Sequence, residues 1–328
     1  MHSSFVLKYG LDTLMTVIFL ILLAGFWWWP GGLVAAPPAA DISPSLAEAP
    51  QTVPLPYFRV PDKVALCGEP VPLNDPEVRE DLDREFTIVV WSRAQTTMWL
   101  KRAHRYFPEI ERKIMDHRLP PDLKYVALVE SDLRPKARSS AGAQGPWQFI
   151  PPTAQRFQLK TDNAVDERLE FTLATDAALR YLQQLHRLFQ DWPLALAAYN
   201  CGEARVQREM AAQGVRSYYH LSLPEETERY VHRIIAAKII LESPGRYGFD
   251  IPQDQLYPPL ASDEVDFSIT KEVQVKTLAA ACGTYYKTIK RLNPWIKGAT
   301  LPPGSHHLQI PKGTAPRFQE AYRRGEIG

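Results

Sequence analysis

The chain has 328 residues, 45% of them apolar, which is enough to bury the cores of two or three domains. A formal net charge of +1 leaves no broad basic field for neutralising phosphates, so we expect no nucleic acid partner and recognition in a cleft instead. Cys67, Cys201 and Cys282 lack the CxxC or Cys/His spacing typical of zinc sites. We therefore expect no metal site. If the chain is exported, two of the three cysteines could form one disulfide.

The first residues form a candidate membrane segment. No charged residue occurs from Thr13 to Ala40, and this run can supply the about 20 residues with which a helix crosses a bilayer. Trp27 to Trp29 would then lie at the membrane interface, which indole rings prefer. We expect residues 1–36 to form an uncleaved membrane anchor.

Two alternatives for this segment concern processing. Val34-Ala35-Ala36 has the small residues of a signal-peptide cleavage site, but Pro37 directly after it disfavours the cut. Leu22 to Gly25 resembles a bacterial lipoprotein signal, yet Phe26 takes the place of the Cys that carries the lipid. The chain is therefore expected not to be a lipoprotein, and export after signal cleavage is the alternative to the anchor.

A spacer and a short helical extension follow. Residues 37–57 hold six prolines together with Ala and Ser, a composition typical of an extended linker. Residues 58–97 are expected to be partly helical, with a helix start at Asp75-Pro76 and an apolar stripe formed by Val78, Leu82 and Phe86. No chemistry is expected there.

Residues 98–245 are expected to form an all-α domain, because helical patterns follow one another without a long alternating strand pattern. Apolar positions recur at helical spacing from Phe171 to Phe189. Asp191-Trp192-Pro193 starts the next helix, and Pro224 stands at the first position of another.

Glu130 lies in an apolar stripe of this domain. Pro120-Pro121-Asp122 marks a helix start, and the stripe that follows at helical spacing consists of Leu123, Val126, Ala127 and Glu130. A carboxylate so placed must find partners or take a raised pKa, because desolvation disfavours its charged form. A Glu protonated near neutral pH is what a general acid needs to protonate a glycosidic oxygen. A Glu turned to solvent, or one satisfied by a buried Arg, is the alternative.

Three sequence blocks lie in order between Glu130 and Val231. The first contains Glu130-Ser131, Pro135 to Ser139, Gly142 to Gly145, Trp147-Gln148-Phe149 and Pro152-Thr153-Ala154; the others are Ala197 to Gly202 and Leu223 to Val231. Together they resemble the signature of the lytic transglycosylases of the soluble-type, lysozyme-like superfamily, and most of all its membrane-bound murein transglycosylase D group.

The resemblance implies a mainly α, lysozyme-like domain that acts as a peptidoglycan lytic transglycosylase. Glu130 would be the sole acid and base, protonating the oxygen of the MurNAc-GlcNAc bond and then accepting the proton of the muramic C6 hydroxyl. That hydroxyl attacks the anomeric carbon and leaves a 1,6-anhydro end. The reaction consumes no water and needs no cofactor, and it requires no second carboxylate as glycoside hydrolysis does.

The resemblance also implies substrate-binding residues. Ser139 and Gln148 would hydrogen-bond the substrate near the cleaved bond. Tyr199 would orient Glu130 or a sugar, Asn200 would support the cleft, and Glu226 would be a second acidic residue that orients it. Structural alternatives are a turn cap for Ser139, bonds to backbone for Gln148 and core packing for Tyr199. For Glu226 the alternative is a favourable interaction with the helix dipole.

Three neighbours of these residues are expected to be structural. Asp132 lies on a different side of the helix from Glu130 and should be solvated. Cys201 should fill a slot for a small residue, and Trp147 should pack in the cleft wall.

Residues 246–262 have the composition of a linker, and residues 263–328 resemble a LysM peptidoglycan-binding module. The pattern predicts a small α+β unit with the order strand, helix, helix, strand, in which the last strand contains Leu308 to Pro311. The Gly-Asp-Thr-Leu turn typical of such modules is replaced by Gln274 to Leu278. Glycan binding and a packing role are both open, and we expect the cleavage of short soluble glycans to be independent of the module.

Two other function classes compete with a peptidoglycan lyase at the periplasmic side of an inner membrane. A lysozyme- or chitinase-like hydrolase would use the same fold with water as the nucleophile, but no motif supplies its second carboxylate. A non-catalytic wall-binding scaffold would also fit a spacer, a helical domain and a LysM-like module, but Glu130 inside a matched motif disfavours it. Proteins of both classes would bind glycan strands. The motifs fit an enzyme that cleaves glycan strands internally and one that cleaves them from their ends equally well.

Overall fold

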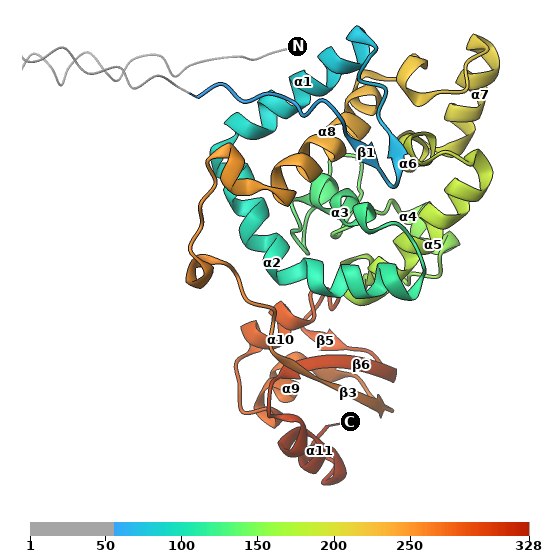
Figure 1. Ribbon diagram of the computed structural model, residues 1–328. Coiled ribbons are helices and arrows are strands. Elements are labelled where there is room, and N and C mark those ends of the chain that lie inside the picture. The colour runs from blue at the N-terminus through green and yellow to red at the C-terminus, as the bar shows by residue number, and fades with distance from the viewer. Residues whose placement is uncertain (1–55, 328) are drawn as a thin grey trace, which may run out of the picture. The chain divides into compact units, whose positions relative to one another are not determined.

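The computed structural model describes residues 56 to 327 (Figure 1). The expected anchor, residues 1–36, and all but the end of the spacer lie outside these residues. Among the described helices, none is both long and apolar enough to cross a membrane.

A short hairpin and eight α-helices form the first and larger part of the described chain. The hairpin consists of β1 (Ala65–Leu66) and β2 (Glu69–Pro70). The helices are α1 (Pro76–Trp91), α2 (Arg93–Asp116), α3 (Lys124–Ser131), α4 (Pro151–Arg156), α5 (Phe171–Phe189), α6 (Trp192–Cys201), α7 (Glu203–Gln213) and α8 (Glu225–Glu242). Short 3₁₀ turns join them: η1 (Pro121–Leu123), η2 (Glu167–Leu169), η3 (Tyr218–His220), η4 (Pro244–Tyr247) and η5 (Gln253–Gln255).

The order of these helices confirms the expected all-α domain. The side chain of Asp75 caps α1 by accepting a hydrogen bond from the Glu77 N–H, and that of Asp191 caps α6 by accepting from the Leu194 N–H. These caps explain why both expected helix starts are found. Pro224 precedes α8 as its N-cap, one position earlier than expected. The fixed φ of proline suits either position, so the sequence alone does not distinguish them.

One hydrophobic core unites the extension and the helical domain. Buried residues of the extension, such as Val60 and Leu66, belong to the same cluster as those of the helices α1 to α8, and α1 packs directly on α8. The short helix α3, green in Figure 1, lies among the longer helices and contacts α2 and α8. Its residues Val126, Ala127 and Leu128 are fully buried. The extension is therefore part of the scaffold around α3.

A second, smaller core lies at the C-terminal end of the described chain. The strands β3 (Ser262–Ile269) and β6 (Gly304–Pro311) pair antiparallel, as do β4 (Val273–Gln274) and β5 (Thr300–Leu301). The helices are α9 (Val275–Ala281), α10 (Tyr286–Leu292) and α11 (Ala315–Arg323). The expected order strand, helix, helix, strand is confirmed. The helix α11, whose Phe318 is almost fully buried, was not expected, and β4 and β5 are too short to form a pattern.

The segment before α5 contributes to this second core. Val165 and Leu169 belong to the same buried cluster as the strands β3 and β6. Val165 forms an antiparallel β-bridge with Ile296, and the backbone N–H of Asp166 donates to the carbonyl of Trp295 at 2.8 Å. Residues far apart in the sequence are therefore joined by backbone pairing.

Candidate active site

Glu130 occupies the last turn of α3, where the helix emerges from the core. The helix is short because Asp132 adopts a left-handed conformation, with φ of 54°, at its C-cap. Glu130 is half-buried. The pKa of Glu130 is raised to about 7. Burial is the main cause, and the negative charge of Glu226 acts in the same direction. The predicted helix and the predicted raised pKa are thus both present.

Tyr230 on α8 is the hydrogen-bond partner of Glu130. Its hydroxyl donates to Oε1 of Glu130 at 2.6 Å. This bond and the positive charge of Arg233 act against burial and lower the pKa of Glu130. Burial and the nearby carboxyl raise the pKa of Tyr230 itself, so the phenol stays protonated and remains a donor. In the sequence, Tyr230 is part of the third motif block, Leu223 to Val231, but no role was assigned to it.

Ser139 and Gln148 belong to a turn-rich stretch, residues 137–149, which we call the active-site loop. The Oγ of Ser139 accepts a hydrogen bond from the Ala143 N–H at 3.1 Å. The Nε2 of Gln148 donates to the carbonyls of Gly145 at 2.7 Å and Ala137 at 3.3 Å. The structural alternatives for both residues are therefore realised. Within the described residues, the Ser139 hydroxyl hydrogen and the Gln148 Oε1 have no partner, so both retain a group for a ligand.

Tyr199 and Asn200 lie at the end of α6. The Tyr199 hydroxyl donates to the carbonyl of Trp147 at 2.8 Å rather than to Glu130, so it fixes the active-site loop. The Oδ1 of Asn200 accepts from the hydroxyl of Thr227 at 2.8 Å, which ties α6 to α8. Contact of Tyr199 with a sugar stays a prediction.

Glu226 lies in the first turn of α8, and its side chain is exposed. This position is favourable for a carboxylate at a helix N-terminus, as the structural alternative proposed. Its charge nevertheless contributes to the raised pKa of Glu130, so the two carboxyl groups belong to one electrostatic site.

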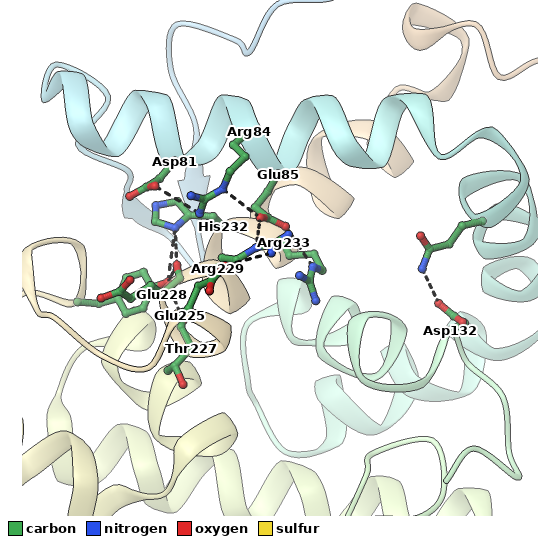
Figure 2. A network of polar contacts seen from close by, with 12 residues as sticks. Asp81, Arg84, Glu85, Asp132, Glu225, Thr227, Glu228, Arg229, His232 and Arg233 are labelled. Atoms are coloured by element: carbon green, nitrogen blue, oxygen red, sulfur yellow. Dashed lines mark hydrogen bonds and ion pairs between the residues drawn. The ribbon is translucent and has the colours of Figure 1, made fainter. Parts of the chain in front are cut away.

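A buried ion network lies behind this site, between α1 and α8 (Figure 2). The Glu85 side chain on α1 is fully buried, and Figure 2 shows arginines converging on it. Its carboxylate binds Nε of Arg229 at 2.6 Å, of Arg233 at 3.2 Å and of Arg84 at 3.4 Å. Arg233 therefore has a fixed partner while its charge acts on Glu130. No chemistry was expected in the extension, residues 58–97, because no motif marks Glu85.

Two of the neighbours expected to be structural, Trp147 and Asp132, make hydrogen bonds within the fold, and the expectation for Asp132 needs a correction. Trp147 is fully buried and donates from its indole to the Thr175 hydroxyl at 2.9 Å, as expected for wall packing. Asp132 is not simply solvated, because its Oδ1 accepts from the indole of Trp99 at 2.6 Å and from Gln95 at 3.1 Å. These bonds give Asp132 a structural role, which ties the end of α3 to α2.

Three cysteines lie in the described chain, and Cys201 is adjacent in sequence to the candidate residue Asn200. Burial raises the pKa of the Cys201 thiol, which disfavours the thiolate that a nucleophile needs. Cys67, Cys201 and Cys282 are all unpaired in the described chain. From residue 56 to 327, no group of three or more His, Cys, Asp or Glu side chains is arranged to hold a metal ion.

Two family profiles match the chain. Residues 108–222 match the Transglycosylase SLT domain, and residues 263–327 match the LysM-like domain of lytic transglycosylase MltD. The chain therefore carries a transglycosylase SLT domain followed by an MltD-type LysM-like domain, and the resemblance drawn from the three motif blocks is confirmed.

Individual relatives are similar over parts of the chain. The membrane-bound lytic murein transglycosylase D of Escherichia coli (strain K12) is 33% identical over 232 residues, which cover 69% of this chain and 50% of that protein. The peptidoglycan transglycosylase gp16 of Escherichia phage T7 is 36% identical over 118 residues, covering 34% of this chain and 9% of that protein. The chain thus spans about half the length of the first of these relatives and far less of the second.

Among solved structures, the chain matches the 70 kDa soluble lytic transglycosylase of Escherichia coli over part of its length. It is 21% identical, with a TM-score of 0.38, and the match covers 51% of this chain and 30% of that chain.

Proposed function

We propose that the protein is a peptidoglycan lytic transglycosylase, which cleaves the MurNAc-GlcNAc β-1,4 bond without water and leaves 1,6-anhydro-MurNAc ends. One observation carries the proposal: Glu130 heads the matched motif, is half-buried, has a pKa of about 7 and is bound by Tyr230. Near neutral pH, both the protonated and the charged form of such a carboxyl group are populated. A single residue can therefore act first as acid and then as base.

Glu130 would transfer its proton through Oε2, because Oε1 already accepts the Tyr230 hydrogen bond. The proton moves to the glycosidic oxygen as the bond from that oxygen to the anomeric carbon breaks. The resulting carboxylate then takes the proton of the C6 hydroxyl while the C6 oxygen attacks the anomeric carbon. The proton lost in the first step is regained in the second, so the enzyme returns to its starting state.

The remaining site residues would hold the substrate and shape the cleft. The Ser139 hydroxyl and the Gln148 Oε1 are two polar groups of the active-site loop that can still bind a ligand, and they would bond the sugars near the cleaved bond. Tyr199 and Asn200 would act mainly by fixing the loop and α8. Glu226 would orient the cleft and keep the pKa of Glu130 high.

Residues 98–245 would be the catalytic domain, residues 246–262 the linker and residues 263–328 the peptidoglycan-binding module. We infer a periplasmic location with the chain held at the inner membrane by residues 1–36. The name of the Escherichia coli relative, a membrane-bound lytic murein transglycosylase, supports this location. Export after signal cleavage is the alternative.

The product ends test this function. A hydrolase of the lysozyme or chitinase type would release reducing ends, whereas the proposed lyase releases 1,6-anhydro ends from purified sacculi. The Oδ1 of Asp132 accepts hydrogen bonds from Trp99 and Gln95, and this structural role supports the lyase over a hydrolase whose second carboxylate holds the nucleophilic water. Absence of any cleavage by the wild-type protein would favour a binding scaffold.

A further inference from the structure

Arg168, in the turn η2, is a buried arginine that holds the active-site loop, residues 137–149. Only 5% of the residue is exposed, and its Nη1 donates to the carbonyls of Gly142 and Phe149, each at 3.1 Å. These carbonyls lie on the two limbs of the loop. The loop also packs closely on the Arg168 backbone, since a Cβ added to Gly145 would lie 1.8 Å from the Arg168 carbonyl oxygen. A small displacement of Arg168 would therefore move the loop.

Asp166 fixes the other edge of the same guanidinium group. Its Oδ1 accepts from Nε of Arg168 at 2.8 Å, and its Oδ2 accepts from Nη2 at 2.7 Å. Such a two-point pair sets the orientation of an arginine as well as its position. Asp166 is only 2% exposed, so its charge has little solvent to replace a lost partner.

Asp166 is also a contact of the C-terminal module. Its backbone N–H donates to the carbonyl of Trp295 at 2.8 Å. The residue before it, Val165, pairs with Ile296 as an antiparallel bridge and is buried in the core of the module, with 3% exposed. Val165 and the Asp166 backbone therefore bind the module, while the Asp166 side chain orients Arg168, whose guanidinium binds the active-site loop.

We propose that Arg168, oriented by Asp166, is a positioning residue for the active-site loop, and that the C-terminal module holds this pair in place through Val165. The proposal rests on the proposed function, because it assumes that Ser139 and Gln148 contact the glycan. It also reverses the expectation that cleavage of short soluble glycans is independent of the module.

The first test replaces Arg168 by Lys in the full chain. Lysine keeps the charge but has one donor centre, so it cannot bind the Asp166 carboxylate and both loop carbonyls in the same geometry. We expect kcat on a short soluble glycan to fall about 10- to 100-fold, the scale of a misplacement near 1 Å. The pH profile should stay unchanged, because Tyr230, Glu226 and Arg233 still surround Glu130.

Two readouts separate positioning from general loss of stability. Amide hydrogen exchange should accelerate in residues 137–149 of Arg168→Lys but stay unchanged in α3, and the unfolding midpoint should remain well above the assay temperature. Arg112→Lys is the matched control, since Arg112 makes an exposed ion pair with Asp116 at 3.5 Å, and its kcat should equal that of the wild type. Wild-type kcat for Arg168→Lys, or a loss of kcat with a shifted pH profile, would overturn the proposal.

The role of the module is tested with two buried valines of the same core. Val165 and Val265 are 3% and 5% exposed, but only Val165 adjoins Asp166. Val165→Ala should lower kcat on the short glycan, whereas Val265→Ala should leave it unchanged. Equal kcat values for the two variants would contradict the proposed role of the module in holding Asp166 and Arg168. If the wild type itself formed no 1,6-anhydro product, the proposed function would fail first, before any variant is compared.

Discussion

Glu130 has a pKa of about 7 because the effects that raise it, burial above all, outweigh those that lower it. Burial and the charge of Glu226 raise its pKa, while the Tyr230 hydrogen bond and the charge of Arg233 lower it. The outcome, about 7, is the range in which one group can donate and recover a proton. Each neighbour is therefore expected to change the pH profile in a direction set by its sign.

Tyr230→Phe tests the largest effect that opposes burial. Removing the hydrogen bond destabilises the carboxylate, so the pKa of Glu130 should rise and the alkaline limb of the rate profile should move to higher pH. A hydrogen bond to a charged group contributes about 1.5–3 kcal/mol, so kcat should also fall by about tenfold or more. Initial rates on a soluble glycan between acidic and alkaline pH measure both. An alkaline limb that moved to lower pH would be inconsistent with this account of Glu130.

The residues that could be predicted from the sequence are those carried by a motif. Glu130 was found because its helical spacing and its motif agree, and its burial and raised pKa follow from that placement. The Tyr230 hydrogen bond was missed because it depends on how α8 crosses α3, which no local pattern specifies. Asp132 was misplaced for a similar reason, since its partner Trp99 comes from α2.

The helices α1 and α8 are joined by Glu85, which makes the extension part of the site's support. A buried carboxylate with three arginines around it fixes the side of α8 from which Tyr230 and Arg233 reach Glu130. Helix starts and apolar faces in this region were predictable from caps and spacing. The ion network was not, because Glu85 comes from a different helix than Arg229 and Arg233.

Glu85→Gln tests the contribution of this network to stability. Removing one partner of a buried ion pair costs about 3–5 kcal/mol, and a lower loss of about 2 kcal/mol is expected here because the arginines are partly exposed. Glu225→Gln is a matched control, since Glu225 pairs with the same Arg229 at 3.6 Å but its side chain is 82% exposed. Chemical denaturation should show a loss for Glu85→Gln and almost none for Glu225→Gln. Equal losses would show that burial of Glu85 adds nothing.

Within residues 56 to 327, the helical domain and the strand–helix unit after it were predictable because each has its own period. An apolar run, a proline-rich spacer, helical patterns and a short strand–helix pattern follow one another. What composition could not supply is the pairing of Val165 with Ile296, because both segments lack a periodic pattern. Contacts between distant segments of this kind depend on the folded backbone.

The proposed membrane anchor, residues 1–36, gives a prediction for the whole chain in the cell. Because the run from Thr13 to Ala40 is uncharged and Phe26 stands where a lipidated Cys would be, the mature protein should keep its N-terminus and fractionate with inner membranes. Intact mass and N-terminal peptides of the purified membrane fraction measure this. A mature chain that starts near Pro37 or Asp41 would instead establish signal cleavage.

The most direct test of the account is mass analysis of the products that the wild type and Glu130→Gln release from purified sacculi. The wild type should form muropeptides with 1,6-anhydro ends, one water lighter than hydrolytic products. Gln matches Glu in size but cannot donate and recover a proton. Acid–base catalysis contributes about 10²- to 10⁴-fold, and one residue serves both steps here, so the variant's rate loss should reach or exceed the upper end.

Circular dichroism and sacculus binding should be nearly the same for both proteins, because the substitution removes a charge that burial disfavours. We expect 1,6-anhydro products from the wild type and none from a folded, glycan-binding Glu130→Gln variant. Substantial turnover by the variant would contradict Glu130 as the proton carrier, and reducing-end products from the wild type would contradict the lyase reaction itself.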